Sequence, residues 1–270
     1  ALYAWHPLPI LEVAGSGHID AAGLFFLCLS LTLLAGEVEE APRRRRLRAL
    51  TAGAAFAAAA LVKLFPLALL PGVLLLAGRR RAPLFLAGAL VTGLCLSLSF
   101  LPELTNASST LVTYARNWEF AGFAFRTLRR LTGSGGTARI LLAALFLLAS
   151  AGAYAVLWRQ RSRNALPALY AVALAFLLLT PTLHPWYALY LAGLLPFAAG
   201  PTGLVLSAAV FLAYRALIPF ALLGTWVDSD GPAAAIFGAT AGAFLLAALG
   251  RSVTRRSDAT SGPATPPWRS

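Results

Sequence analysis

The stretch ILLAALFLLASAGAYAVL, residues 140–157, carries no charged side chain. As a helix rising about 1.5 Å per residue, it comes close to covering the roughly 30 Å hydrocarbon core of a bilayer. Similar apolar runs occupy residues 21–35, 84–101 and 204–223. Recurring runs of this length predict a chain that crosses a membrane several times.

The composition agrees with this prediction. Hydrophobic residues make up 59% of the chain and charged residues 12%, whereas soluble domains carry about 25% charged residues. A soluble globular domain is therefore excluded, and the lipid bilayer is a predicted partner. The net charge of +12 comes from short basic clusters between apolar runs. Because these clusters lack the basic face and stacking aromatics of a nucleic-acid binder, we predict no nucleic-acid partner.

We predict an all-α fold, a polytopic transmembrane helical bundle of about eight or nine hydrophobic helices that include one short hairpin. Residues 1–250 are predicted to form the membrane domain, and residues 251–270 a disordered cytoplasmic tail rich in Ser, Thr, Pro and Arg. The chain has no Met and starts at Ala1, so we expect further residues to precede it. The helices are expected at about 20–36, 47–63, 64–78, 83–101, 138–158, 165–180, 187–199, 204–223 and 232–249.

Residues 47–63 and 64–78 could form a tight hairpin broken at Phe65-Pro66 or one long kinked helix. Lys and Arg accumulate in short cytoplasmic loops. The hairpin assigns most basic residues to the cytoplasmic side, whereas the kinked helix divides them equally. We therefore predict the hairpin, with Lys63 at its tip. Because each arm is shorter than the bilayer core, the tip should lie below the outer surface.

The longest outer connection, residues 102–137, mixes aromatic and basic residues. Its stretch 114–120 is followed by Phe123, Phe125, Arg126, Arg129 and Arg130. This mixture is typical of a helix that lies in the membrane interface.

With the hairpin topology, polar and aromatic residues from separate stretches reach the outer side together, and all three histidines of the chain are among them. We therefore expect one site at the outer membrane face. The residues are Trp5, His6, Pro7, Glu12, His18, Asp20, Lys63, Trp118, Glu119, His184, Pro185, Trp186 and Tyr187.

Several of these residues have a structural alternative. Asp20 directly precedes an apolar helix and could be its N-cap, which contributes about 1 kcal/mol. His18 could cap the same helix end. Trp118, Trp186 and Tyr187 could be aromatic residues of the interfacial belt.

Three charged residues lie where a charge is costly. Glu12 stands in an apolar stretch, and an unpaired carboxylate there loses its hydration. Lys63 within a helix costs about 2.5–3.5 kcal/mol on insertion scales and marks a pathway or site, unless its side chain reaches the outer headgroups. Arg215 lies within the run 204–223 and needs a buried partner or an anionic ligand.

Four short elements follow one another along residues 1–190. They are Tyr3-Ala4-Trp5-His6-Pro7-Leu8 with Glu12 and Gly15-Ser16-Gly17-His18-Ile19-Asp20; Leu61-Val62-Lys63-Leu64-Phe65-Pro66-Leu67; Asn117-Trp118-Glu119-Phe120; and Thr180-Pro181-Thr182-Leu183-His184-Pro185-Trp186-Tyr187. Together they resemble the motifs of bacterial C-type superfamily polytopic glycosyltransferases, of the polyprenyl-phosphate-mannose-dependent mannosyltransferase kind. His6 and Ile19 stand where those enzymes usually carry Asn, and Ala121 or Gly122 replaces their loop Asn.

The resemblance implies transfer of a hexose, with mannose favoured, from a polyprenyl-phosphate donor to an extracytoplasmic glycan or lipid acceptor with inversion. It implies a multi-pass protein of the plasma membrane, and a catalytic acidic residue upstream of Ala1. A departing phosphate gathers negative charge that fixed cations stabilise. We therefore expect donor phosphate binding by Lys63, His18, His184 and Arg215, and sugar or acceptor binding by Glu12, Asp20, Trp118, Trp186 and Tyr187. No zinc-type spacing or carboxylate cluster demands a metal, although a bridging divalent metal would be compatible with the chemistry.

Two other functions remain open. A transporter or flippase of lipid-linked sugars would hold the phosphate with the same cations without breaking a bond. It would place polar groups at mid-membrane from several helices, where Arg215 is the clear candidate. A scaffold subunit of an envelope-synthesis complex is the third interpretation.

Overall fold

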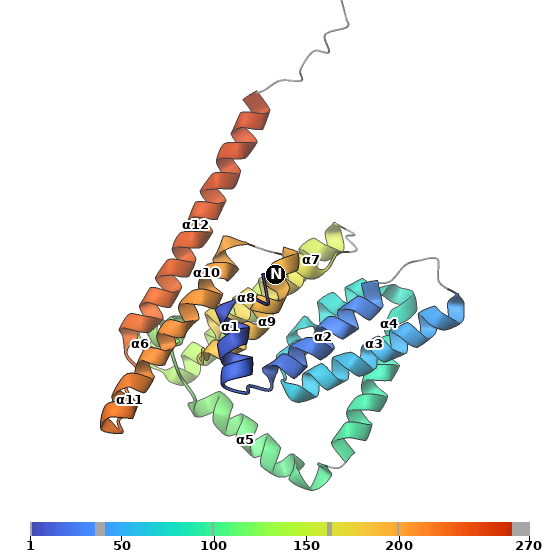
Figure 1. Cartoon of the computed structure of the whole chain (residues 1–270), viewed down its shortest axis with the longest axis horizontal. Coiled ribbons are helices and arrows are strands. Elements are labelled where there is room, and N and C mark those ends of the chain that lie inside the picture. Colours follow the sequence, from blue (N-terminus) through green and yellow to red (C-terminus); the bar gives the residue numbers. More distant parts are fainter. Residues whose placement is uncertain (1, 36–40, 99, 161–163, 199, 261–270) are drawn as a thin grey trace, which may run out of the picture.

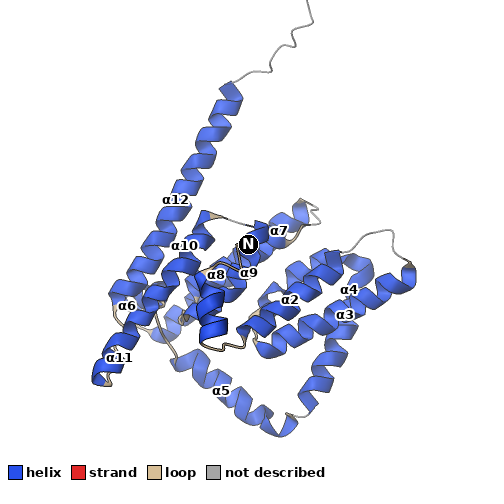
Figure 2. Cartoon of the chain, viewed as in Figure 1, coloured by secondary structure: helices blue, strands red, loops and turns tan. Residues whose placement is uncertain are grey.

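The computed structural model describes residues 2–35, 41–98, 100–160, 164–198 and 200–260. Most of these residues lie in helices joined by loops, and two isolated β-bridges join residues 120–121 to Thr182 (Figure 2). The predicted all-α fold is confirmed. The elements are α1 (Pro7–Pro9), the π-helix η1 (Ile10–Gly15), α2 (Asp20–Ala35), α3 (Pro42–Val62), α4 (Pro66–Leu98), η2 (Leu101–Glu103), α5 (Leu104–Asn117), α6 (Phe123–Thr132), α7 (Gly135–Arg159), α8 (Leu166–Leu179), η3 (Pro185–Ala188), α9 (Leu189–Ala198), α10 (Pro201–Ala209), η4 (Val210–Ala216), α11 (Leu217–Leu223) and α12 (Asp230–Thr260).

The helices pack in three neighbouring groups (Figure 1). The first group consists of α2, α3 and α4, the second of α7, α8 and α9, and the third of α10 and α12. The short elements α1 and η1 precede α2, and α1 contacts α9, α10 and η3. Figure 1 shows α5 running from the end of α4 along the lower edge of the view, after which the chain rises to α6. The first residues of the chain are thus held among its last helices.

The element α4 consists of two antiparallel arms. Gly78 has φ 70° and ψ 164°, outside the helical region. Leu67 and Ser97 line the same groove, although a straight helix would separate them by about 45 Å. The chain therefore turns back at Gly78, where the left-handed φ costs glycine little. This turn agrees with the predicted boundary between the helices 64–78 and 83–101. The predicted hairpin is formed by α3 and the first arm of α4, with Lys63 at its tip.

Several predicted boundaries are corrected. α3 begins at Pro42 rather than at residue 47, because proline suits the first helical turn. The predicted helix 204–223 is divided into α10, η4 and α11. α12 continues to Thr260, beyond the predicted helix end at residue 249, while residues 261–270 of the predicted tail lie outside the described part of the chain.

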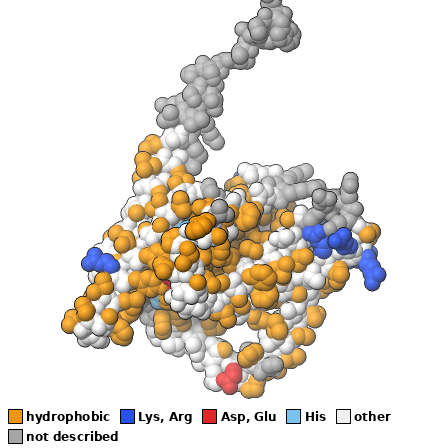
Figure 3. Space-filling view, viewed as in Figure 1, with side chains coloured by type: hydrophobic (Ala, Val, Ile, Leu, Met, Phe, Trp, Pro, Cys, Tyr) orange, Lys and Arg blue, Asp and Glu red, His pale blue; other side chains and the backbone are white. Residues whose placement is uncertain are grey.

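The surface of the bundle is apolar over most of the face seen in Figure 3. Leu147 and Leu148 on α7, for example, are 65% and 69% exposed. Among the described residues, four stretches are long and apolar enough to cross a membrane: 66–98 (through the turn at Gly78), 135–159, 201–223 and 230–250. Apolar exposure on this scale fits contact with lipid, so the chain is a multi-pass membrane protein.

Basic side chains gather near the end of the molecule where α3 begins (Figure 3). Arg48 Nε donates to the carbonyl of Leu33 at 3.1 Å, and Arg81 Nη1 donates to the carbonyl of Leu34 at 2.7 Å. These cations satisfy carbonyls at the C-terminal end of α2. The opposite end of α2 starts at Asp20, so α2 separates the arginines from the site described below.

α3 and α4 approach each other at a reciprocal pair of glycines. A Cβ atom at Gly53 would lie 1.9 Å from the carbonyl oxygen of Phe85, and one at Gly88 would lie 2.0 Å from that of Leu50. Small residues allow backbones to approach in this way within membranes. The close contact fixes α3, whose last residue precedes Lys63.

Candidate active site

Glu12 is completely buried in the π-helix η1. Single π-helical turns are frequent at functional sites. The hydroxyl of Tyr214 donates to both carboxylate oxygens, at 2.7 and 2.9 Å. His18 Nε2 lies 3.3 Å from Oε2 of the same carboxylate. Glu12 is therefore paired, as the cost of burying a carboxylate requires.

His18, Trp186 and His184 form a stack of rings that continues onto Phe120. The ring centroids of His18 and Trp186 are 4.1 Å apart, those of Trp186 and His184 are 4.3 Å apart, and those of His184 and Phe120 are 4.9 Å apart. An imidazole covers each face of Trp186. The indole of Trp186 therefore lies between the two histidines, and its binding of a sugar ring stays a prediction.

Lys63 forms the C-cap of α3 in an extended conformation. Its Nζ lies 2.9 Å from Asp20 Oδ1 and 4.4 Å from the centroid of the Tyr187 ring. Asp20 is buried, so its carboxylate does more than start α2. The hydroxyl of Tyr187 is hydrogen-bonded to that of Tyr114 on α5. Tyr187 therefore presents one ring face to a cation, and its binding of a sugar or acceptor stays a prediction.

Most of the predicted site residues thus meet at one end of the bundle. We call the group formed by Glu12, His18, Asp20, Lys63, His184, Trp186 and Tyr187 the polar cluster. Trp118 borders it, with its ring centroid 6.5 Å from that of His184 and the residue 53% exposed. Arg215 does not join it, because its side chain is exposed and makes no contact with the polar cluster among the described interactions.

His184 stands in the connection between α8 and α9, outside the spanning helices. Burial lowers the pKa of His184 from 6.5 to about 4, and the charges of Lys63 and His18 act in the same direction. His184 is therefore neutral at pH 7. It can donate an N–H to a ligand, but it does not supply a positive charge.

This lowered pKa predicts a pH dependence of stability. Between about pH 4 and 6.5 the unfolded chain binds a proton at His184 that the folded chain does not, so the contribution of His184 is complete above 6.5 and is lost as pH falls toward 4. We expect the thermal midpoint of the purified protein in detergent to fall over this window more steeply than that of His184→Gln. Parallel curves for the two proteins would contradict the assignment.

The segment 118–122 is fixed beside the polar cluster by short backbone pairing. Phe120 N donates to the carbonyl of Pro181 at 3.1 Å, and Leu183 N donates to the carbonyl of Phe120 at 2.7 Å. A Cβ atom at Gly122 would lie 2.3 Å from the oxygen of Pro181. Glycine is therefore required for this approach, which places Phe120 against His184.

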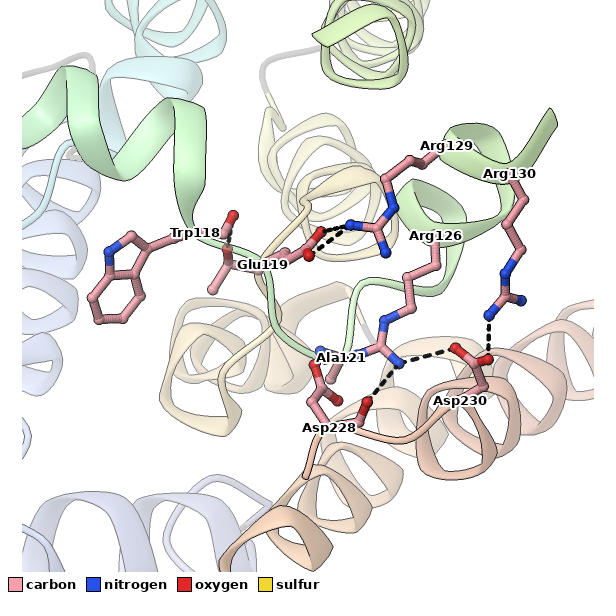
Figure 4. A network of polar contacts seen from close by, with 9 residues as sticks. Trp118, Glu119, Ala121, Arg126, Arg129, Arg130, Asp228 and Asp230 are labelled. Atoms are coloured by element: carbon pink, nitrogen blue, oxygen red, sulfur yellow. Dashed lines mark hydrogen bonds and ion pairs between the residues drawn. The ribbon is translucent and has the colours of Figure 1, made fainter. Parts of the chain in front are cut away.

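An ionic network holds the same segment from its other side (Figure 4). Arg126 is 8% exposed and forms ion pairs with Asp228 and Asp230, while Asp228 Oδ2 accepts from Ala121 N at 3.1 Å. Two further pairs, Arg129 with Glu119 and Arg130 with Asp230, extend the network. The predicted interfacial stretch is divided between α5 and α6. The three arginines lie on α6 and face acids from the loop and from the start of α12.

Four residues that contact or support the polar cluster are not among the predicted site residues: Tyr114, Tyr214, Asp228 and Asp230. Tyr214 is uncharged and neighbours Arg215 in an apolar run, so it carries no signal of costly burial. The acids did carry a signal, because they precede an apolar helix on the same predicted side as Arg126.

A metal site would need several His, Cys, Asp or Glu side chains close together. Within the described ranges, no group of three or more His, Cys, Asp or Glu side chains could hold a metal ion. Glu12 and Asp20, the buried carboxylates of the polar cluster, are instead paired with His18 and Lys63.

A comparison with protein families matches residues 1–181 to Glycosyltransferase family 87. The chain belongs to this family. It is therefore a glycosyltransferase, with a sugar donor and an acceptor as substrates. Neither the curated proteins nor the solved structures gave a significant match. The family 87 match includes Glu12, Asp20 and Lys63, and it ends before His184 and Tyr214.

Proposed function

We propose that this family 87 glycosyltransferase moves a hexose, with mannose favoured, from a polyprenyl-phosphate donor to a glycan or lipid acceptor outside the cytoplasm of the plasma membrane, with inversion. The observation that carries the proposal is the Lys63 ammonium, held between Asp20 and Tyr187 at the end of an apolar helix. A cation kept at such a position marks a site. The base for the acceptor remains predicted upstream of Ala1.

The chemistry requires charge stabilisation at the leaving group. The acceptor oxygen bonds to the anomeric carbon as the bond from that carbon to the phosphate oxygen breaks, and the base takes the acceptor proton. An ammonium has three N–H donors. Asp20 engages one and the Tyr187 ring lies against another face, which leaves a donor of Lys63 for a phosphate oxygen. The neutral His184 adds an N–H group beside it, and the ring of His18 adds a further polar group.

The open aromatic surface for a sugar ring belongs in this proposal to Trp118. Its side chain is exposed beside His184, and its carbonyl accepts from Thr182 Oγ1 at 3.1 Å and from Arg139 Nη2 at 3.2 Å. Because these hydrogen bonds fix the backbone of Trp118, little conformational entropy is lost when its ring binds a sugar.

The placement outside the cytoplasm is supported by charge. The arginines at the end of α2 opposite Asp20 match the cytoplasmic excess of basic residues in membrane proteins. The polar cluster then faces the other side.

An apolar groove supports a lipid-linked donor. Its volume is about 450 Å³, and it lies between the end of α3 and the two arms of α4. Leu61 and Leu64, which flank Lys63 in the sequence, are part of its lining. An isoprenoid tail in this groove would bring its phosphate to the ammonium. Van der Waals contacts with the apolar lining would hold the tail there.

Filling the groove should discriminate between donors by tail length. A Cβ atom at Gly93 would meet nothing within 4 Å, so Gly93→Trp can place its indole in the groove without a backbone clash. We expect KM for a long-chain donor to rise about tenfold, which corresponds to about 1.4 kcal/mol, while a donor with two isoprene units is unaffected. Gly152→Trp on α7, also in open space, is the matched control. Equal effects on both donors would remove the groove from the proposal.

The function itself is tested with the full-length protein in proteoliposomes. Labelled polyprenyl-phosphate mannose, glucose and galactose are supplied with a cell-envelope extract as acceptor. We expect label to move to the acceptor from one of them with release of polyprenyl phosphate. Movement of the intact donor across the bilayer would favour the flippase, and neither event would contradict the proposal.

A further inference from the structure

Among the described contacts, a residue that follows α9 in the chain also reaches the polar cluster. Tyr214 lies in η4, beyond the part that matches family 87. Its hydroxyl donates to Glu12 Oε1 at 2.7 Å and to Oε2 at 2.9 Å. Glu12 has 0% exposure, and His18 is its other partner among the described contacts.

A buried ion pair is a poor way to gain stability, because an apolar replacement often holds the fold as well. The arrangement must therefore be judged by what it orients. The bifurcated hydrogen bond fixes the plane of the Glu12 carboxylate, and that carboxylate holds one ring nitrogen of His18. The His18 side chain is still 28% exposed, so its remaining edge is accessible to a ligand.

The His18 ring is coupled to the rest of the polar cluster through its stack on Trp186 and His184. Its position along the stack depends on the carboxylate that holds it. We propose that Tyr214 is a positioning residue: its hydroxyl fixes Glu12 so that Glu12 holds His18 ready to bind the donor phosphate. The phosphate as ligand rests on the proposed function.

The test is Tyr214→Phe, which removes one oxygen and keeps the ring. We expect affinity for polyprenyl phosphate, measured in nanodiscs, to fall about tenfold, and kcat/KM for transfer to fall by a similar factor. With Lys63, Asp20 and His184 unchanged around the site, the loss should appear as a higher KM for the donor, with kcat within about twofold of the wild type.

Ser207→Ala is the matched control. Ser207 on α10 is hydrogen-bonded to His6 Nε2 at 2.9 Å, so it joins the same two parts of the chain without contacting Glu12. Its affinity for polyprenyl phosphate and its KM for the donor should stay within about twofold of the wild type. The inference is overturned if Tyr214→Phe binds polyprenyl phosphate as the wild type does, or if Ser207→Ala shows the same loss. If Tyr214→Phe binds polyprenyl phosphate more weakly but the wild type transfers no hexose, the proposed function is contradicted and the role of Tyr214 is not.

Discussion

Replacing Lys63 with Ala is expected to lower kcat/KM for hexose transfer by at least about 100-fold, the usual effect of removing one donor from a site of developing negative charge. The reason is geometric. Lys63 is the ammonium that Asp20 and Tyr187 hold in the polar cluster, and neutral His184 cannot replace its charge. Transfer of labelled hexose in proteoliposomes measures the effect, and Arg80→Ala, which removes an exposed cation at the opposite end, should leave it unchanged.

A second comparison separates lost chemistry from lost folding. Lys63→Ala also leaves the carboxylate of Asp20 buried without its cation, which costs about 3 kcal/mol or more. Adding Asp20→Asn removes that charge, so the double variant should recover most of the thermal stability and none of the transfer. Recovery of both would show that Lys63 acts on the fold and not on the phosphate.

Gly53→Leu is expected to prevent accumulation of folded protein. The added Cβ atom would lie 1.9 Å from the carbonyl oxygen of Phe85, which is backbone and cannot move aside as a side chain could. α3 and α4 would have to separate along their contact, at a cost of about 3 kcal/mol or more. The yield of monodisperse protein in detergent measures this effect.

Gly152→Ala provides the contrast for this substitution. Gly152 lies inside α7 with open space at its Cβ position. Alanine should be neutral there or add up to about 1 kcal/mol through its helix propensity. Equal yields from Gly53→Leu and Gly152→Ala would mean that the α3–α4 contact is not as close as described.

The fold could be predicted from the sequence because lipid imposes simple rules. Apolar runs had to become helices, and the distribution of arginines favoured the turn at Lys63. Helix ends were harder, since Pro42 starts α3 earlier than the apolar run indicates. The turn at Gly78, in contrast, coincides with the predicted end of the helix 64–78.

The site was predictable as far as charge indicated it. Glu12, Asp20 and Lys63 are costly to bury, so their meeting could be expected. The ring contacts of Trp186 and Tyr187 could not, because a sequence does not show which rings and cations meet. The charge of Arg215 predicts a role in phosphate binding, whereas the contact with Glu12 is made by its uncharged neighbour Tyr214.

The close fit between the first residues and the last helices has a practical consequence for chimeras. His6 depends on Ser207, Glu12 on Tyr214, and Ala121 on Asp228. A hybrid joined near residue 181 would inherit one half of each pair from a different parent. A chimera of two relatives should therefore fold only if both residues of each pair come from the same parent. Substitutions at the paired positions are expected to covary.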